Sequence, residues 1–190
     1  MDLMTAIKER RSCRSFSPQP LADGLVERLL EAAAWAPSPL NSQPWEFVIV
    51  SGETKKQEIL AEAERCHRWA VEASGWKWLS GYRMDFLTQA PVIVAVVGDP
   101  KKTGVDMFQT EGGVAYQHAC AAAIQNLQLA AHAEGIGSLW FTFFDKDPMR
   151  RILEVPAEKT PLALVCLGYP AGDPTPVPRK EIDKKIRYIG

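Results

Sequence analysis

One stretch constrains the fold more than any other, residues 112–137, which read GGVAYQHACAAAIQNLQLAAHAEGIG. No charged residue lies between Glu111 and Glu134, and the Ala, Leu and Gln that dominate the run are compatible with helix. At ~1.5 Å per residue, its 22 uncharged positions predict one helix of ~33 Å. Because such a helix has no charged face, it needs cover on most sides, from its own domain or from a second subunit.

A helix of this length would also cross a bilayer, so both environments must be weighed. Polar groups occur on every face and the flanks are not strongly hydrophobic, which argues against a membrane span. We therefore expect a buried helix in a soluble protein, with small Ala faces that favour a dimer interface and with Gly135-Ile136-Gly137 as its stop. The polar residues are Gln117, His118, Gln125, Asn126, Gln128 and His132.

Composition bounds the remaining choices. The 190 residues, 46% hydrophobic, can form one substantial core, so we predict a single domain spanning 1–190. The net charge is −1, from 22 basic and 23 acidic residues, which suggests neither a nucleic-acid nor a membrane partner. The N-terminal MDLMTAIKERRS lacks the apolar core of a signal peptide, so we expect a cytoplasmic protein.

Cysteine and histidine spacing predicts no metal site. The four cysteines are separated by 46 to 54 residues and form no C-x-x-C pair, so we expect free thiols. His118 and His132 would lie ~21 Å apart along one helix and cannot share an ion. The cysteines are Cys13, Cys66, Cys120 and Cys166.

A basic cluster follows a predicted helix over 2–11. It places four cations within seven residues around Ser12, namely Lys8, Arg10, Arg11 and Arg14, and it ends in RRSCRSF. Guanidinium forks with a hydroxyl donor suit a phosphate or a carboxylate. The alternative is a solvated basic face at a helix C-terminus, where the helix dipole favours cations.

A proline-braced polar loop follows a second predicted helix over 21–35. In APSPLNSQPWEFVIV, three prolines restrain several hydrogen-bonding side chains before a predicted strand over 45–51. Such a loop is either a simple turn or a surface for a ring with several hydrogen-bonding edges. The prolines are Pro37, Pro39 and Pro44, and the polar residues are Ser38, Asn41, Ser42 and Gln43.

These two motifs, R-R-S-x-R-x-F and, about 25 residues later, A-P-S-x-x-N-x-Q-P-W-x-F, resemble the nitroreductase family of FMN-dependent oxidoreductases, in particular its small single-domain members. The resemblance implies an α+β, three-layer fold with a mixed central sheet flanked by helices, and an intertwined homodimer with FMN at the subunit interface. By the same resemblance, Arg10, Arg11, Ser12 and Arg14 would hold the FMN phosphate and ribityl chain. Pro37, Ser38, Pro39 and Asn41 would approach that flavin from the partner subunit.

The resemblance extends to later residues. Trp140, Phe141 and Thr142 would run beside the isoalloxazine, with Thr142 as a hydrogen-bond partner of flavin N5. The proline-rich tail 171–190 would extend over the partner subunit, where Arg179, ranked ahead of Lys180, would reach the phosphate.

The segment 66–88 is rich in aromatic residues. Trp69, Trp76 and Trp78 lie near Gly75 and Gly81. They either pack in the core or form a mobile lid over the flavin that binds flat aromatic substrates, as the resemblance implies.

The remaining elements follow from hydrophobic pattern and turn residues. We expect a short helix that Asp147 caps and that has Pro148 at its first position. The other expected elements are an exposed helix over 54–65, strands over 91–97, 138–144 and 161–167, and a polar connector over 98–111.

No dinucleotide, phosphate-loop or hydrolase-elbow motif is present, so a bound flavin would carry the chemistry and no protein residue is predicted as catalytic. The resemblance implies that NAD(P)H gives hydride to flavin N5 and that a nitroaromatic, quinone or similar acceptor then takes the electrons by a ping-pong mechanism. The alternatives are a specialised relative, such as a flavin-fragmenting dimethylbenzimidazole synthase or a reductive dehalogenase, and a non-catalytic dimerisation module. NADH versus NADPH, the acceptor, and one- or two-electron transfer stay open.

Overall fold

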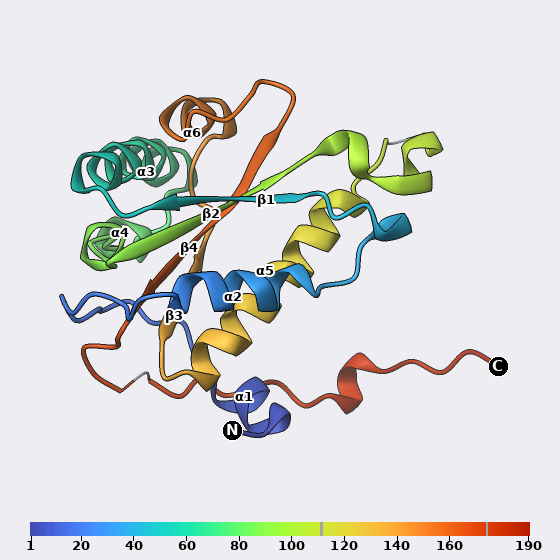
Figure 1. The fold of residues 1–190 in the computed structure, drawn as a ribbon, viewed down its shortest axis with the longest axis horizontal. Coiled ribbons are helices and arrows are strands. Elements are labelled where there is room, and N and C mark those ends of the chain that lie inside the picture. Colours follow the sequence, from blue (N-terminus) through green and yellow to red (C-terminus); the bar gives the residue numbers. More distant parts are fainter. Residues whose placement is uncertain (111, 174) are drawn as a thin grey trace.

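A four-stranded sheet between two helical layers forms the body of the protein. The computed structural model describes residues 1–110, 112–173 and 175–190. The strands lie in the order β1-β2-β4-β3. Helices α3, α4 and α6 cover one face and α2 and α5 the other, so the predicted α+β, three-layer class is confirmed (Figure 1). The bounds are α1 Leu3–Glu9, α2 Leu25–Ala34, β1 Trp45–Val50, α3 Glu53–Ser74, α4 Phe86–Gln89, β2 Val92–Gly98, α5 Ala115–Ala133, β3 Gly137–Phe141, α6 Lys146–Ile152 and β4 Thr160–Gly168.

The strands of this sheet pair antiparallel. In the middle of the sheet Ala95 lies opposite both Val48 and Leu164. A parallel pairing occurs at the isolated bridge between Ser12 and Ser138, beside β3. The mixed sheet that we expected is therefore antiparallel in its four strands. The apolar runs in β2 and β4 arise because helices cover both faces of the sheet. Such a run does not indicate whether a strand pairs parallel or antiparallel with its neighbours.

Alternate residues of β2 supply two separate cores. Ile93 and Ala95 pack against α3, α4 and α6, whereas Val94 and Val96 pack against α2 and α5. This period of two is the alternation of side chains along a strand. The sheet thus separates the two cores, and packing in both cores positions the segments that follow the strand ends.

Helix α5 is the predicted central helix, although it begins at Ala115 and ends at Ala133. Its buried face includes Cys120, Ala123 and Leu127, whereas His118 and Gln125 are exposed. The protomer therefore covers most of the helix but not all of it. Among the described helices, none has the combined length and apolarity to traverse a bilayer.

Helix α3 differs most from expectation. We predicted an exposed helix ending at residue 65, but α3 continues to Ser74, where Gly75 terminates it at φ +65°. Lys56 and Glu62, expected on the surface, are only 6% exposed. Because the helix is rich in Lys and Glu, its buried face at helical spacing was not recognised. The residues after 65 were interpreted as part of a separate aromatic segment, so the continuation of the helix was missed.

Smaller corrections concern where individual helices and strands begin and end. Asp145, not Asp147, is the N-cap of α6, and Pro148 occupies its third position. Asp147 instead pairs with Arg150 within the helix, and a proline is tolerated throughout a first turn because those N–H groups need no intrahelical acceptor. The strand predicted over 138–144 stops at Phe141.

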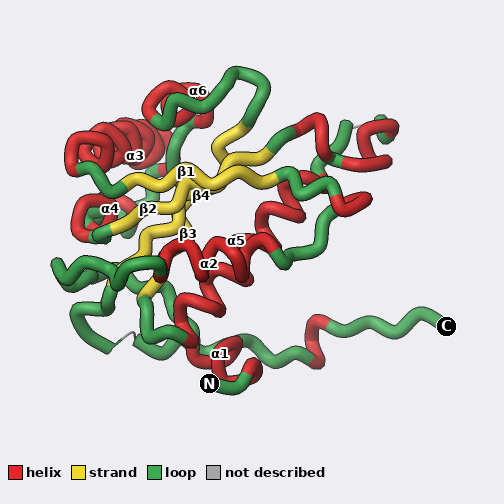
Figure 2. Tube along the Cα trace, in the orientation of Figure 1, coloured by secondary structure: helices red, strands yellow, loops and turns green. Residues whose placement is uncertain are grey.

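The C-terminal tail leaves the body of the molecule and extends past α1 (Figure 2). Its described residues are exposed and irregular, apart from a 3-10 turn at Asp183–Lys185, as the prediction of an extended tail requires. The predicted tail 171–190 and connector 98–111 include Pro174 and Glu111, which lie outside the described residues. Within the connector, 3-10 turns occupy Pro100–Lys102 and Gly104–Phe108.

Candidate functional site

The predicted phosphate residues line one cavity of about 590 Å³. It forms where the segment after α1 meets the start of the C-terminal tail, so residues from the two ends of the chain lie together. Arg10, Arg11, Ser12, Arg14 and Arg179 all line it. Burial, followed by the nearby charges of Arg11 and Arg179, lowers the pKa of Arg10. The cavity therefore concentrates positive charge that an anion would stabilise.

Arg11 carries the clearest sign of an incomplete site. Its Nη1 donates to the carbonyl oxygens of Lys8 and Arg10, but its Nε is buried and has no hydrogen-bond acceptor among the described residues. Buried polar groups normally have a partner, and an unpaired one costs about 1–3 kcal/mol. Arg11 lines the cavity, so an anionic group bound there is a candidate partner for its guanidinium.

Strand β3 leads away from this cavity. Ser12 bridges to Ser138, and the Cys13 N–H donates to the Ser138 carbonyl over 2.9 Å. Thr142 lies four residues further along the chain, which is ~13 Å at ~3.3 Å per residue of strand. The basic cavity and Thr142 are thus separated by a distance that suits the two ends of one elongated ligand.

The aromatic residues before Thr142 have different environments. Phe141 is 4% exposed and makes an edge contact with Phe86 at a centroid distance of 5.6 Å. Its side chain belongs to the core, so it can meet a ligand only through its backbone. Trp140 is 37% exposed on the opposite face of the strand, and Thr142 is exposed.

The proline-braced loop has a strained backbone. Leu40, Asn41 and Gln43 have φ values of 51°, 54° and 45°, which non-glycine residues seldom adopt. The Ser38 hydroxyl oxygen accepts the Gln43 N–H over 3.0 Å, and the Asn41 side-chain oxygen accepts from Gln43 Nε2 over 3.3 Å. Backbone strain that the surroundings maintain is typical of ligand-binding segments.

Within one protomer, this loop and the basic cavity lie apart. Helix α2 separates Ser17 from Pro37 along the chain, and its 10 residues span ~15 Å. The loop follows the C-terminal end of α2, whereas the arginine segment precedes the N-terminal end (Figure 1). This separation is compatible with the prediction that the loop approaches the flavin of a partner subunit.

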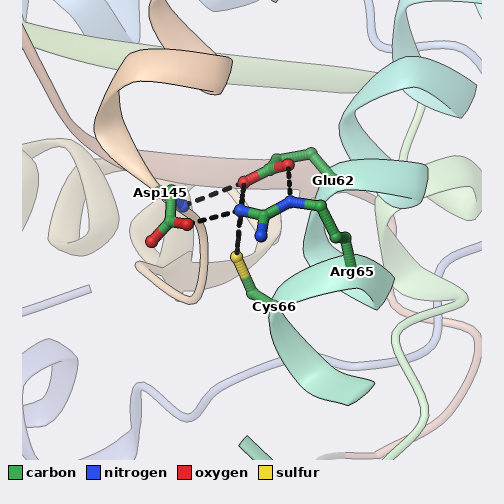
Figure 3. A network of polar contacts seen from close by, with 4 residues as sticks. All are labelled: Glu62, Arg65, Cys66 and Asp145. Atoms are coloured by element: carbon green, nitrogen blue, oxygen red, sulfur yellow. Dashed lines mark hydrogen bonds and ion pairs between the residues drawn. The ribbon is translucent and has the colours of Figure 1, made fainter. Parts of the chain in front are cut away.

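A polar network joins α3 to the connection between β3 and α6 (Figure 3). The buried Glu62 carboxylate accepts from Arg65 Nε and Nη2, each over 2.8 Å, and from the Asp145 N–H over 3.1 Å. Arg65 also pairs with the Asp145 carboxylate. These bonds, those from Arg65 foremost, lower the pKa of Glu62, while burial and the adjacent Glu62 raise the pKa of the Cys66 thiol to about 11.

The same network contains a group of metal-ligand types. Ligand atoms of Glu62, Cys66 and Asp145 lie within 4.8 Å of one another. The Arg65 guanidinium bonds to both carboxylates, so both already have a cationic partner. The cysteines of the chain are free, as predicted, and all four are buried.

The three tryptophans proposed for a lid are exposed. Trp69 lies on α3, and Trp76 and Trp78 follow it, with exposed fractions of 69%, 59% and 64%. The rings of Trp76 and Trp78 stack at a centroid distance of 5.7 Å. The core-packing interpretation is therefore wrong for these three residues. They form an aromatic surface near the end of α3.

Several polar contacts were not found from the sequence. Gln128 of α5 donates to the Ser138 hydroxyl over 3.2 Å and so connects α5 to β3. Asp106 accepts from the Thr103 hydroxyl over 2.7 Å and from the Val114 and Ala115 N–H groups, which satisfies the start of α5 from a neighbouring loop. The Thr103 bond is the main reason why the pKa of Asp106 is lowered. The contacts of Asp106 span 3 to 9 residues and the Gln128–Ser138 pair spans 10, so each depends on how the intervening loop folds.

The chain is similar to known proteins over most of its length. Residues 7–169 match the profile of the Nitroreductase family. A protein of Rhodospirillum rubrum named 5,6-dimethylbenzimidazole synthase is 32% identical over 176 residues, covering 90% of this chain and 83% of the relative. A Thermus thermophilus protein named NADH dehydrogenase is 31% identical over 198 residues, covering 99% of this chain and 96% of the relative.

Among solved structures, oxidized iodotyrosine deiodinase bound to FMN and 3-iodo-L-tyrosine is similar over the whole of both chains. The TM-score is 0.86 and the sequence identity 26%, with 100% of each chain covered. The fold described above therefore occurs in a protein that binds FMN.

Proposed function

This chain belongs to the nitroreductase family, and from that premise we propose that it is an FMN-dependent oxidoreductase that passes electrons from NAD(P)H to a nitroaromatic, quinone or similar acceptor. The observation that carries the proposal is the cavity lined by Arg10, Arg11, Arg14 and Arg179. A phosphate ester there would accept from several guanidinium groups and pair the buried Arg11 Nε. The FMN-bound deiodinase and the relative named NADH dehydrogenase support this cofactor and this donor.

Two groups of residues would bind the two ends of the cofactor. The phosphate end would be held, and the whole cofactor thereby positioned, by Arg10, Arg11, Ser12, Arg14 and Arg179. Thr142, at the far end, offers a hydroxyl and an N–H to the ring. FMN, when bound, supplies hydride acceptance and donation, which no protein side chain provides. A donor and then an acceptor would react with the bound cofactor in turn, which is the ping-pong order that we propose.

A complete site requires a second copy of the chain. The strained loop with Pro37, Ser38, Pro39 and Asn41 reaches the flavin of the partner subunit, because α2 holds it away from its own basic cavity. The exposed tail 171–190 extends over the same partner, and the partly exposed face of α5 contributes to the interface. We accordingly propose an intertwined homodimer of single-domain subunits in the cytoplasm.

The test is the absorption spectrum of the purified protein before and after anaerobic addition of NADH and, separately, NADPH. Flavin bands that bleach with one donor and return with a quinone are expected. A colourless protein that also fails to bind added FMN would overturn the proposal and favour a non-catalytic dimerisation module.

A second candidate function rests on the similarity to dimethylbenzimidazole synthase, at 32% identity, and a related one on the fold similarity to the deiodinase. The specialised reaction of a flavin-fragmenting enzyme consumes the flavin itself. Protein reduced in air would then lose its flavin absorption permanently instead of cycling. A reductive dehalogenase would release halide from a halogenated phenol under the same reducing conditions.

A further inference from the structure

A small cavity adjoins Thr142 on the side away from the basic cavity. Its volume is about 110 Å³. Helix α3 forms one wall and the connection from β3 to α6 forms the other. The lining combines three aromatic rings with one guanidinium group: Arg65, Cys66, Trp69, Thr142, Phe143, Phe144 and Asp145. None of these walls takes part in the basic cavity described above.

Arg65 is held in a defined orientation. Its Nε and Nη2 donate to the two oxygens of Glu62, each over 2.8 Å, in the paired geometry of a bidentate bond. Nη2 also pairs with Asp145, which lies on the opposite wall. Because Glu62 is 6% exposed and also accepts the Asp145 N–H, the guanidinium is bound to a buried, immobile group. It is therefore oriented before any ligand arrives.

One nitrogen of this guanidinium is left for a ligand. Nη1 has no hydrogen-bond acceptor among the residues that the structure describes, and it is turned away from both carboxylates (Figure 3). A guanidinium group does not lose its proton in proteins, so Nη1 is always a donor. The side chain of Arg65 is 47% exposed, which leaves this donor accessible.

Charge and size restrict what Nη1 can bind. Glu62 and Asp145 carry two negative charges against the one positive charge of Arg65, so an anionic ligand would meet net repulsion. A cavity of ~150 Å³ lined by apolar side chains holds benzene. This cavity, at about 110 Å³, is smaller, so it takes at most one ring, part of which stays outside it. Trp69, Phe143 and Phe144 offer the faces and edges against which such a ring packs.

We propose that Arg65 determines acceptor specificity: this cavity takes a single-ring, uncharged aromatic acceptor whose carbonyl or nitro oxygen accepts a hydrogen bond from Arg65 Nη1. This rests on the proposed function, because Thr142 belongs both to this cavity and to the ring end of the cofactor site. Glu62 is then a positioning residue, which acts on the acceptor only through Arg65.

The experiment compares Arg65→Lys with Arg68→Lys in the flavin-loaded protein. The lysine introduced by Arg65→Lys retains a positive charge beside Glu62, but as a point charge it lacks the second fork of donors. Arg68 lies exposed on the same helix and does not line the cavity, so its substitution is the matched control. Binding of acetophenone and of benzoate is measured by calorimetry, and reduction of 1,4-benzoquinone and bleaching by the nicotinamide donor are measured separately.

We expect acetophenone to bind at least tenfold more tightly than benzoate, and Arg65→Lys to weaken acetophenone binding about tenfold, the value of one hydrogen bond to a charged donor. The benzoquinone KM should rise by a similar factor in Arg65→Lys, with the bleaching rate unchanged. Arg68→Lys should alter none of these. Equal acetophenone affinity in the two variants, or tighter binding of benzoate, would overturn the assignment of Arg65 while leaving the flavin reaction intact. A protein that binds no FMN would instead defeat the proposed function.

Discussion

Gly104 lies so close to Pro39 that a Cβ at position 104 would stand 2.6 Å from the Cβ of Pro39. Gly104 also has a φ of +83°, which a side chain would strain. Pro39 starts the turn in which Leu40 and Asn41 adopt positive φ values. The turn at Gly104–Phe108 therefore packs against the strained loop. This close contact is possible because Gly104 has no side chain.

Gly104→Ala should consequently displace the loop. Overpacking and backbone strain together predict a loss of about 2–4 kcal/mol in the free energy of unfolding, and FMN affinity should fall at least tenfold if the loop contacts the flavin. Urea unfolding and fluorescence titration with FMN measure the two effects. Gly135→Ala is the control, because its φ is +74° and no atom lies within 4 Å of its added Cβ. Unchanged FMN affinity in Gly104→Ala would disprove the role of the loop.

Arg14→Ala tests the phosphate assignment. Arg14 is exposed and lines the basic cavity, so its removal should leave the fold intact but cost ~1.5–3 kcal/mol of FMN binding, roughly 10- to 100-fold in affinity. Riboflavin lacks the phosphate, so its affinity should stay the same in this variant. Arg28→Ala, exposed on α2, serves as the control. An equal loss of affinity for FMN and for riboflavin would show that Arg14 does not bind the phosphate.

Much of the fold could be predicted because its signals are local. The apolar runs at 91–97 and 161–167 correspond to β2 and β4 within a residue or so, and the uncharged run at 112–137 contains α5. The family resemblance is confirmed. It depended on two motifs with a characteristic order and spacing.

The rest depended on contacts between distant residues. Glu62 and Asp145 are 83 residues apart, and Gln128 meets Ser138 only because α5 packs on β3. Nothing in the local pattern distinguishes a buried Glu62 from the exposed acids around it. Likewise, burial on both faces makes a strand apolar throughout, so the antiparallel pairing of β2 and β4 was not readable from composition.

The exposed tryptophans give a test that separates packing from binding. Trp76 and Trp78 contact each other but are mostly exposed, so Trp76→Ala and Trp78→Ala should each change the free energy of unfolding by no more than about 1 kcal/mol. If they cover the acceptor, the kcat/KM for a quinone should fall several-fold. Trp35→Ala, at a site 82% exposed outside this surface, should change neither. A large loss of stability without any change in kcat/KM would instead indicate packing.

Glu62→Gln should change stability in a pH-dependent way. The bonds from Arg65 lower the pKa of Glu62 below its ordinary value of 4.5, so the folded protein holds this proton less tightly than the unfolded chain. The resulting stabilisation is complete well above pH 4.5 and is lost as the pH falls through the lower, folded pKa. At pH 7 the variant should be about 1–3 kcal/mol less stable, and the gap to the unmodified protein should narrow in acid. Urea unfolding across this range measures it, with Glu64→Gln, exposed on the same helix, as the control. A gap that stays constant from pH 7 into acid would mean that the Glu62 charge does not stabilise the link between α3 and Asp145.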